Sequence, residues 1–296
     1  MAEQKDKETG KSLLSLHAAV MLFGLSSVLG RFVDAPAAAV AGGRVVCSSL
    51  ALLLLALVRK EPLRLRTSGD WKLAIFAGLV LAIHWTTFFQ SIQTASVAIG
   101  TITFSTFPLF LTFLEPLIFR EPLRLRNLGT AALLLAGIFI TVPEFSVENR
   151  TTVGILWGLV CSLAYAVLSL ANRRLSRRYP ARTICLYEQG TAAAALLPFL
   201  LFTPVQWTPR TVAGIAAIGF LCTAFAHSLY VSAQRKVSAQ TAGIISGLET
   251  VYGILYALLF LGEVPSLREI AGGLVILGAA LAASLRPAKE RPQHAA

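Results

Sequence analysis

Long apolar stretches separated by short polar segments fill the chain between Ser12 and Leu285. Each stretch has roughly the 20 residues that a helix needs to cross a bilayer. None shows the alternating apolar and polar positions of a membrane β-strand, and backbone groups in lipid must be hydrogen-bonded within the chain, so the stretches are expected to be helices. The pattern predicts an all-α polytopic membrane protein with ten transmembrane helices, at 12–32, 37–58, 71–93, 97–119, 126–143, 152–171, 181–203, 211–233, 239–261 and 266–285.

The composition agrees with this pattern. Of the 296 residues, 55% are hydrophobic and only 14% are charged, and the mean hydropathy is +0.69. A soluble domain of this length needs far more charge for its surface.

The net charge of +11 follows the alternation of the predicted loops. Of the 26 Lys and Arg residues, 21 lie in alternate loops and in the two tails, 1–11 and 286–296. The positive-inside rule then predicts that both termini are cytoplasmic. Because the basic residues are explained by topology, we expect no nucleic-acid partner.

One segment repeats within the chain. A shift of 142 residues places REPLRLRNLGTAALLLAG (120–137) on GEVPSLREIAGGLVILGA (262–279), with Glu121 on Glu263, and the same shift sets Pro108 on Thr250. The halves, 12–147 and 148–285, hold five predicted helices each. An odd number means that they cross the membrane in opposite senses. Inverted five-helix repeats around a central cavity suit a transporter that works by alternating access.

These motifs, with Arg44 early in the second stretch, resemble the EamA-type members of the drug/metabolite transporter superfamily over nearly the whole chain. Among the branches, the chain is most similar to bacterial aromatic amino-acid exporters. The family often carries Leu-Glu-Pro where this chain has LET, with Thr250 in place of the proline. The resemblance implies a multi-pass protein of the bacterial inner membrane that exports amino acids.

Three ionisable residues lie well inside the stretches: Arg44, Glu188 and Glu249. A charge at the centre of a span costs roughly 2.5–3.5 kcal/mol, so such groups face the interior of a helix bundle and mark a pathway. Glu249 is either a group that binds the ammonium of a zwitterion, a proton carrier or a structural hydrogen-bond hub. Arg44 falls in the outer half of its span and Glu188 in the inner half, so the two need not meet.

Aromatic and histidine side chains form stripes at helical spacing on several stretches. Such stripes belong either to packing or to a binding site. The candidate substrate-binding residues are His84, Trp85, Phe88, Trp157, Tyr165, His227, Tyr230, Glu249 and Tyr252. The candidate structural or gating residues are Arg44, Pro108, Glu121, Glu188 and Glu263; both Glu121 and Glu263 precede a helix, where a carboxylate complements the helix dipole.

The sequence therefore predicts a secondary exporter of small metabolites, most of all aromatic amino acids, with the lipid bilayer and the substrate as partners and protons as a further candidate. The alternative is a proton-coupled exporter of cationic compounds with the same fold. An enzyme is not expected, because neither H-E-x-x-H nor a nucleotide-binding loop occurs. The four cysteines lack metal spacing, so no cofactor is expected. A non-transporting membrane subunit, with 271–280 as its packing face, is a further alternative.

Overall fold

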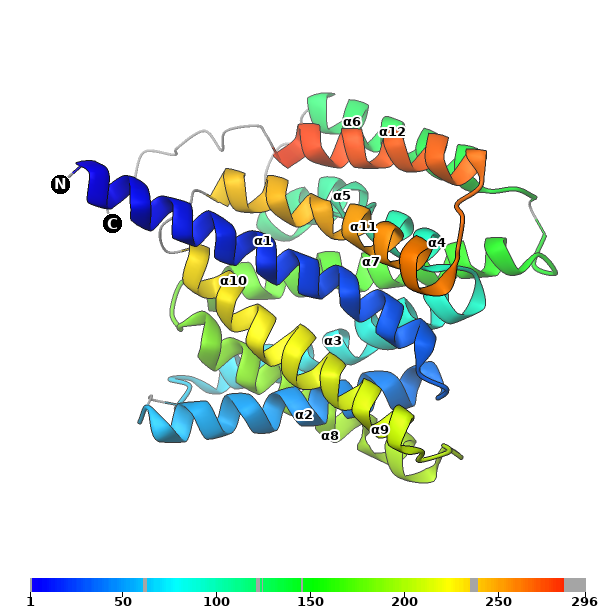
Figure 1. The fold of residues 1–296 in the computed structure, drawn as a ribbon. Helices are drawn as coiled ribbons and strands as arrows, with labels where there is room; N and C mark the ends of the chain where they lie inside the picture. Colours follow the sequence, from blue (N-terminus) through cyan, green and yellow to red (C-terminus); the bar gives the residue numbers. More distant parts are fainter. Residues whose placement is uncertain are drawn as a thin grey trace.

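The computed structural model describes residues 2–60, 63–120, 123, 125–144, 146–234 and 239–284 (Figure 1). Every regular element in these ranges is a helix, which confirms the prediction of an all-α protein. The elements are α1 (Ala2–Phe32), α2 (Ala37–Val58), α3 (Ser68–Thr94), α4 (Val97–Phe104), α5 (Phe107–Phe119), α6 (Leu125–Thr141), α7 (Arg150–Leu175), α8 (Ala181–Phe202), α9 (Pro209–Ala216), the π-helix η1 (Ala217–Phe225), α10 (Ala226–Gln234), α11 (Ala239–Leu261) and α12 (Leu267–Ser284).

Many of these helices are apolar enough to cross a membrane. Seven described segments have the length and hydropathy of a span: Gly10–Phe32, Ala37–Val58, Ser68–Thr94, Val97–Phe119, Arg150–Leu175, Ala181–Phe202 and Pro209–Tyr230. Two shorter apolar helices, Asn127–Thr141 and Ile245–Leu261, accompany them. The chain is therefore a polytopic membrane protein.

The helix ends follow local rules. The α2 and α8 helices both begin directly after a proline, Pro36 and Pro180, whose backbone angles are nearly the same (φ −56°, ψ 146° and φ −61°, ψ 144°). A proline has no N–H to leave unpaired, so it suits the start of a helix. Threonine hydroxyls cap two other helices: Thr67 accepts from the N–H of Asp70 in α3, and Thr208 accepts from the N–H of Thr211 in α9.

The stretch predicted as one helix at 97–119 is divided into α4 and α5 at Ser105 and Thr106. Pro108 causes the division, because it has no N–H to donate to the preceding turn and its ring clashes with the carbonyl group four residues before it. Polar side chains from distant helices contact the break: the hydroxyl of Ser105 is 2.8 Å from that of Thr250, and the hydroxyl of Thr106 is 3.2 Å from that of Ser162. α11, where Thr250 replaces the proline, continues without a break.

The stretch predicted at 211–233 contains a π-helical segment, η1. Its wider turn is accompanied by a hydrogen bond from the hydroxyl of Thr223 to the carbonyl oxygen of Ile218 at 2.7 Å. Gly219 lets η1 lie very close to α2, since a Cβ at Gly219 would be 3.0 Å from the carbonyl oxygen of Arg44. This close approach sets Thr223 beside Arg44.

The helices pack in pairs that are distant in sequence. α6 and α12 run side by side at one edge of the bundle, and α2 and α8 pack at the opposite edge (Figure 1). Between them, α1 contacts α10 and α11, while α3 contacts α7 and α8. The small residues of 271–280 serve this packing within the chain: a Cβ at Gly272 would be 2.6 Å from the carbonyl oxygen of Gly137 in α6.

Candidate functional site

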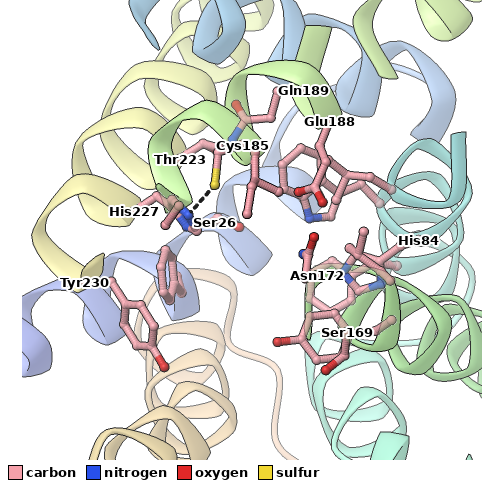
Figure 2. Close-up of a pocket in the computed structure, with 18 of the residues that line it drawn as sticks. Ser26, His84, Ser169, Asn172, Cys185, Glu188, Gln189, Thr223, His227 and Tyr230 are labelled. Atoms are coloured by element: carbon pink, nitrogen blue, oxygen red, sulfur yellow. Dashed lines mark hydrogen bonds between the residues drawn. The ribbon is translucent and has the colours of Figure 1, made fainter. Parts of the chain in front are cut away.

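A cavity of about 450 Å³ lies within the helix bundle, and Figure 2 shows residues of its wall. Its wall is built by side chains of α1, α2, α3, α4, α7, α8, η1, α10 and α11. The three ionisable residues inside the predicted spans, Arg44, Glu188 and Glu249, all line it. Arg44 and Glu188 thus share one cavity, although their positions in the sequence did not predict that they would meet.

Arg44 is held in place by neutral groups. Its Nε donates to the hydroxyl of Thr223 at 2.8 Å, and its Nη1 lies 3.5 Å from the hydroxyl of Ser26. The guanidinium carbon lies 4.0 Å from the centre of the Trp85 ring, in cation–π geometry. Among the described residues no carboxylate oxygen lies within 4.0 Å of its nitrogens. The arginine charge is oriented but is not neutralised by an ion pair.

Glu249 reaches the same cavity from α11. Within the described part of the chain its carboxylate forms no ion pair. The residue occupies the central turns of α11, with Thr250 next to it directed toward the break between α4 and α5. The contacts of Thr250 anchor this part of α11 and leave the Glu249 carboxylate toward the cavity.

Glu188 and Asn172 form a second polar region of the wall, where their side chains point toward one another (Figure 2). Glu188 is only 4% exposed. Its Oε1 and the Oδ1 of Asn172 have no hydrogen-bond partner among the described residues. Gln189 adds a third such oxygen on the neighbouring part of α8. Buried polar atoms are nearly always hydrogen-bonded, so these oxygens are suited to accept hydrogen bonds from a molecule bound in the cavity.

Aromatic rings form another part of the wall. The ring centre of His84 lies 5.3 Å from that of Tyr165 and 5.4 Å from that of Phe104. Phe104 in turn lies 5.1 Å from Tyr165 and 5.8 Å from Phe88. The Nδ1 of His84 lies 3.1 Å from the carbonyl oxygen of Cys161. The Nδ1 atom of His84 is therefore occupied, and the face of the ring belongs to the aromatic cluster.

His227 and Tyr230 line the cavity from α10. The Nε2 of His227 is 2.9 Å from the sulfur of Cys185, as Figure 2 shows. The hydroxyl of Tyr230 is 2.8 Å from that of Ser246 on α11. These contacts join α10 to α8 and to α11 around the cavity.

A second group of charged residues lies outside the cavity, near the end of α3 and the start of α4. Arg31 of α1 pairs with Glu263 at 3.2 Å and donates to the carbonyl oxygen of Gln93 at 2.6 Å. The other carboxylate oxygen of Glu263 accepts from the backbone N–H of Val97 at 2.9 Å. We call Arg31, Gln93, Val97 and Glu263 the outer cluster. Glu263 was expected to complement the dipole of the helix that follows it, α12, and it caps α4 instead.

Seven of the nine predicted substrate-binding residues line the cavity: His84, Trp85, Phe88, Tyr165, His227, Tyr230 and Glu249. Trp157 does not; it lies roughly 80° around α7 from Tyr165 and is 39% exposed. Tyr252 packs against α1, where Gly24 allows close contact, and its hydroxyl is 3.3 Å from Nδ1 of His17. Trp157 and Tyr252 are therefore left out of the binding site proposed below.

The predicted structural residues are distributed differently. Pro108 lies in the first turn of α5, and Glu121 falls outside the described residues. Sequence reasoning missed Ser26, Asn172 and Gln189, which line the cavity. Their residue types could have identified them, because serine and amide side chains within an apolar span need a hydrogen-bond partner.

The model of the EamA-like transporter family matches residues 10–142 and 152–285. The chain belongs to this family. An uncharacterized transporter of Archaeoglobus fulgidus is 27% identical over 71% of this chain and 74% of its own length. The uncharacterized transporter YwfM of Bacillus subtilis is 24% identical over 86% of both chains. The pseudopaline exporter CntI of Pseudomonas aeruginosa is 24% identical over 79% of this chain and 81% of its own.

A solved crystal structure shares the fold, with a TM-score of 0.64 and 18% identity over 93% of this chain and 96% of that one. These relatives are named as transporters or exporters. This EamA-like chain is therefore a transport protein of the drug/metabolite transporter superfamily and not an enzyme.

Proposed function

We propose that this protein is a secondary exporter of amino acids, with a preference for aromatic ones, in the bacterial inner membrane. The observation that carries the proposal is that Arg44 and Glu249 line one cavity without pairing with each other. Two unneutralised charges of opposite sign match the carboxylate and the ammonium of an amino acid. The family membership, and one relative that is named an exporter, support transport out of the cell.

The residues that line the cavity determine how an amino acid would bind. The guanidinium of Arg44, already oriented by Thr223 and Trp85, offers N–H donors to the substrate carboxylate. Glu249 accepts from the ammonium. A phenyl side chain would then lie against the rings of Phe104 and Tyr165, since aromatic pairs gain energy beyond their buried area.

We further propose ten transmembrane helices in two inverted repeats, 12–147 and 148–285. Backbone features at matching positions support this. Arg120 and Gly262, 142 residues apart, both have positive φ (54° and 68°), each directly after a helix. Helix starts match at nearly the same shift: Pro36 precedes α2 as Pro180 precedes α8, 144 residues later, and Thr67 caps α3 as Thr208 caps α9, 141 residues later.

The contacts between helices also support the proposed inverted repeats. The contact between α3 and α7 has its counterpart in that between α10 and α1, and the contact between α4 and α7 corresponds to that between α11 and α1. The pairs α2–α8 and α6–α12 join equivalent helices of the two halves. A cavity at the interface of inverted repeats is where a transporter binds its substrate.

The cavity extends toward the basic side of the protein. Ser176 and Ala181, which line it, lie in the arginine-rich segment 173–182. At the other end Phe89, Ile92 and Val97 are fully buried. With the termini and basic loops in the cytoplasm, this arrangement corresponds to the inward-facing state, in which an exporter loads its substrate.

A proton-coupled exporter of cationic compounds is the second candidate, and the unpartnered oxygens of Glu188 and Asn172 favour it. In that case no carboxylate would be needed on the substrate. The role of Arg44 separates the two candidates.

Transport by purified protein in liposomes tests the proposal. Labelled phenylalanine and threonine would be measured with and without a pH gradient, for the wild type and for Glu249→Gln. We expect faster flux of phenylalanine than of threonine, and loss of both in the folded variant. Acceleration by the gradient would add protons as the coupling ion. No phenylalanine flux in the wild type would contradict the proposal and favour cationic compounds.

A further inference from the structure

On the basis of the amino-acid transport proposed above, we propose that Glu188 and Asn172 form a second subsite, which binds a primary amine at the far end of the substrate side chain. Diamino acids of the lysine type would thus be substrates as well as aromatic amino acids. The subsite would hold the distal amine while Arg44 and Glu249 hold the α-carboxylate and α-ammonium.

The unpartnered oxygens define the chemistry of the subsite. Oε1 of Glu188 and Oδ1 of Asn172 are both acceptors, both are buried, and both side chains line the cavity and point toward one another (Figure 2). An ammonium group has three N–H donors and no acceptor, so one group can satisfy both oxygens and neutralise the carboxylate. Carboxylates and other anions would be repelled. The subsite is therefore specific for a cationic donor.

The position of the subsite sets the length of the substrate. Pro36, before α2, and Pro204, after α8, line one surface pocket, so the two helices are antiparallel. Gly42 faces Leu196, since a Cβ at Gly42 would be 3.4 Å from the Cβ of Leu196.

Arg44 is thus level with residue 194 of α8, six residues from Glu188. At about 1.5 Å per residue, the two backbones are separated by roughly 9 Å along the helix axis. The α-ammonium and α-carboxylate of an amino acid are attached to one carbon atom. An amine at the end of a four-carbon side chain lies farther away and matches this separation.

Norleucine provides a matched comparison, because its side chain follows that of lysine but ends in a methyl group and lacks the amine. Binding of lysine, norleucine and phenylalanine would be measured by calorimetry with the full chain in detergent micelles. We expect wild-type protein to bind lysine at least about tenfold more tightly than norleucine, as charged hydrogen bonds allow.

In Glu188→Gln the preference for lysine should disappear, while the affinities for norleucine and phenylalanine stay the same. Asn172→Leu should also reduce the preference for lysine over norleucine. Glu148→Gln, the same change at an exposed carboxylate outside the cavity, serves as the control and should leave the ratio unchanged.

Equal affinities of the wild type for lysine and norleucine would overturn the second subsite alone, and Glu188 would then be a neutral acid whose proton is donated to Asn172. Equal weakening of all three ligands by Glu188→Gln would overturn it too, because it would assign Glu188 to the structure. If no amino acid bound, the proposed function would fail, and this subsite with it.

Discussion

The outer cluster and the central cavity use the same residue types in opposite ways. In the outer cluster, Arg31 and Glu263 bond to each other, and each also binds backbone groups at a helix end. In the cavity, Arg44 and Glu249 have no ionic partner among the described residues. Glu188 has an oxygen with no partner at all in that part of the chain.

The difference separates structural charges from functional ones. A charge that is paired and caps a helix stabilises the fold, because it satisfies N–H or carbonyl groups that the helix leaves open. A charge held unpaired in an apolar bundle destabilises the fold and is expected to act on a ligand. The contrast predicts that substitutions in the cavity lower transport, and substitutions in the outer cluster lower stability.

The largest effect is expected for Arg44→Gln. Without the guanidinium, the substrate carboxylate loses a charged hydrogen bond, so phenylalanine flux should fall roughly 10- to 100-fold. Arg44→Lys keeps the charge but not the planar set of donors, and should lose less activity. Flux in proteoliposomes, divided by the amount of folded protein, measures both. Flux within about twofold of the wild type in Arg44→Gln would remove Arg44 from the site.

Glu263→Ala should act on stability instead. The variant loses the ion pair with Arg31 and the cap on Val97, and its free energy of unfolding should fall by about 1–2 kcal/mol. Thermal unfolding in detergent micelles would show a lower midpoint, with phenylalanine affinity unchanged. Glu148→Ala, an exposed carboxylate in a loop, is the control. An unchanged unfolding midpoint in Glu263→Ala would contradict the stabilising role of the outer cluster.

Trp85→Leu should have an intermediate effect. The Trp85 ring lies under the guanidinium of Arg44, and a cation–π contact contributes about 0.5–1 kcal/mol, or more when desolvated. Leucine keeps the apolar volume without the ring, so the affinity for phenylalanine should fall by roughly two- to fivefold. Trp85→Phe should restore most of it. An equal loss in both variants would mean that the shape of the indole, and not its electron density, orients Arg44.

The smallest effects are expected at two residues that the sequence pattern assigned to the substrate. Trp157 does not line the cavity and is partly exposed, and Tyr252 packs against α1. Trp157→Leu and Tyr252→Phe should therefore leave phenylalanine affinity within about twofold of the wild type. A larger loss in either variant, measured by the same binding assay, would show that the substrate site extends beyond the cavity described here.

The sequence predicted what depends on hydropathy and helical period. The all-helical fold follows from the length of the apolar stretches. The stripes around Trp85 and Tyr230 could be found because side chains three and four residues apart share a helix face, although the pattern left open whether they pack or bind. Glu249 stood out because it is the only charged side chain between Lys236 and Glu263.

The partners of each charge could not be predicted in the same way, since they come from helices far apart in the chain. Glu263 caps α4, which begins 166 residues before it. Asn172 and Glu188 lie on different helices, and only packing turns both toward the cavity. The division of α4 from α5 follows from Pro108, but its contact with Thr250 depends on the fold.

The most direct test of the central claim is a set of three ligands on three proteins. Phenylalanine, phenethylamine (which lacks the carboxylate) and phenylpropionate (which lacks the ammonium) would be titrated into the wild type, Arg44→Gln and Glu249→Gln. We predict that the wild type prefers phenylalanine to both analogues by at least about tenfold. Arg44→Gln should bind phenylalanine no better than phenethylamine, and Glu249→Gln no better than phenylpropionate. If each variant weakened all three ligands equally, Arg44 and Glu249 would not hold the two ends of an amino acid.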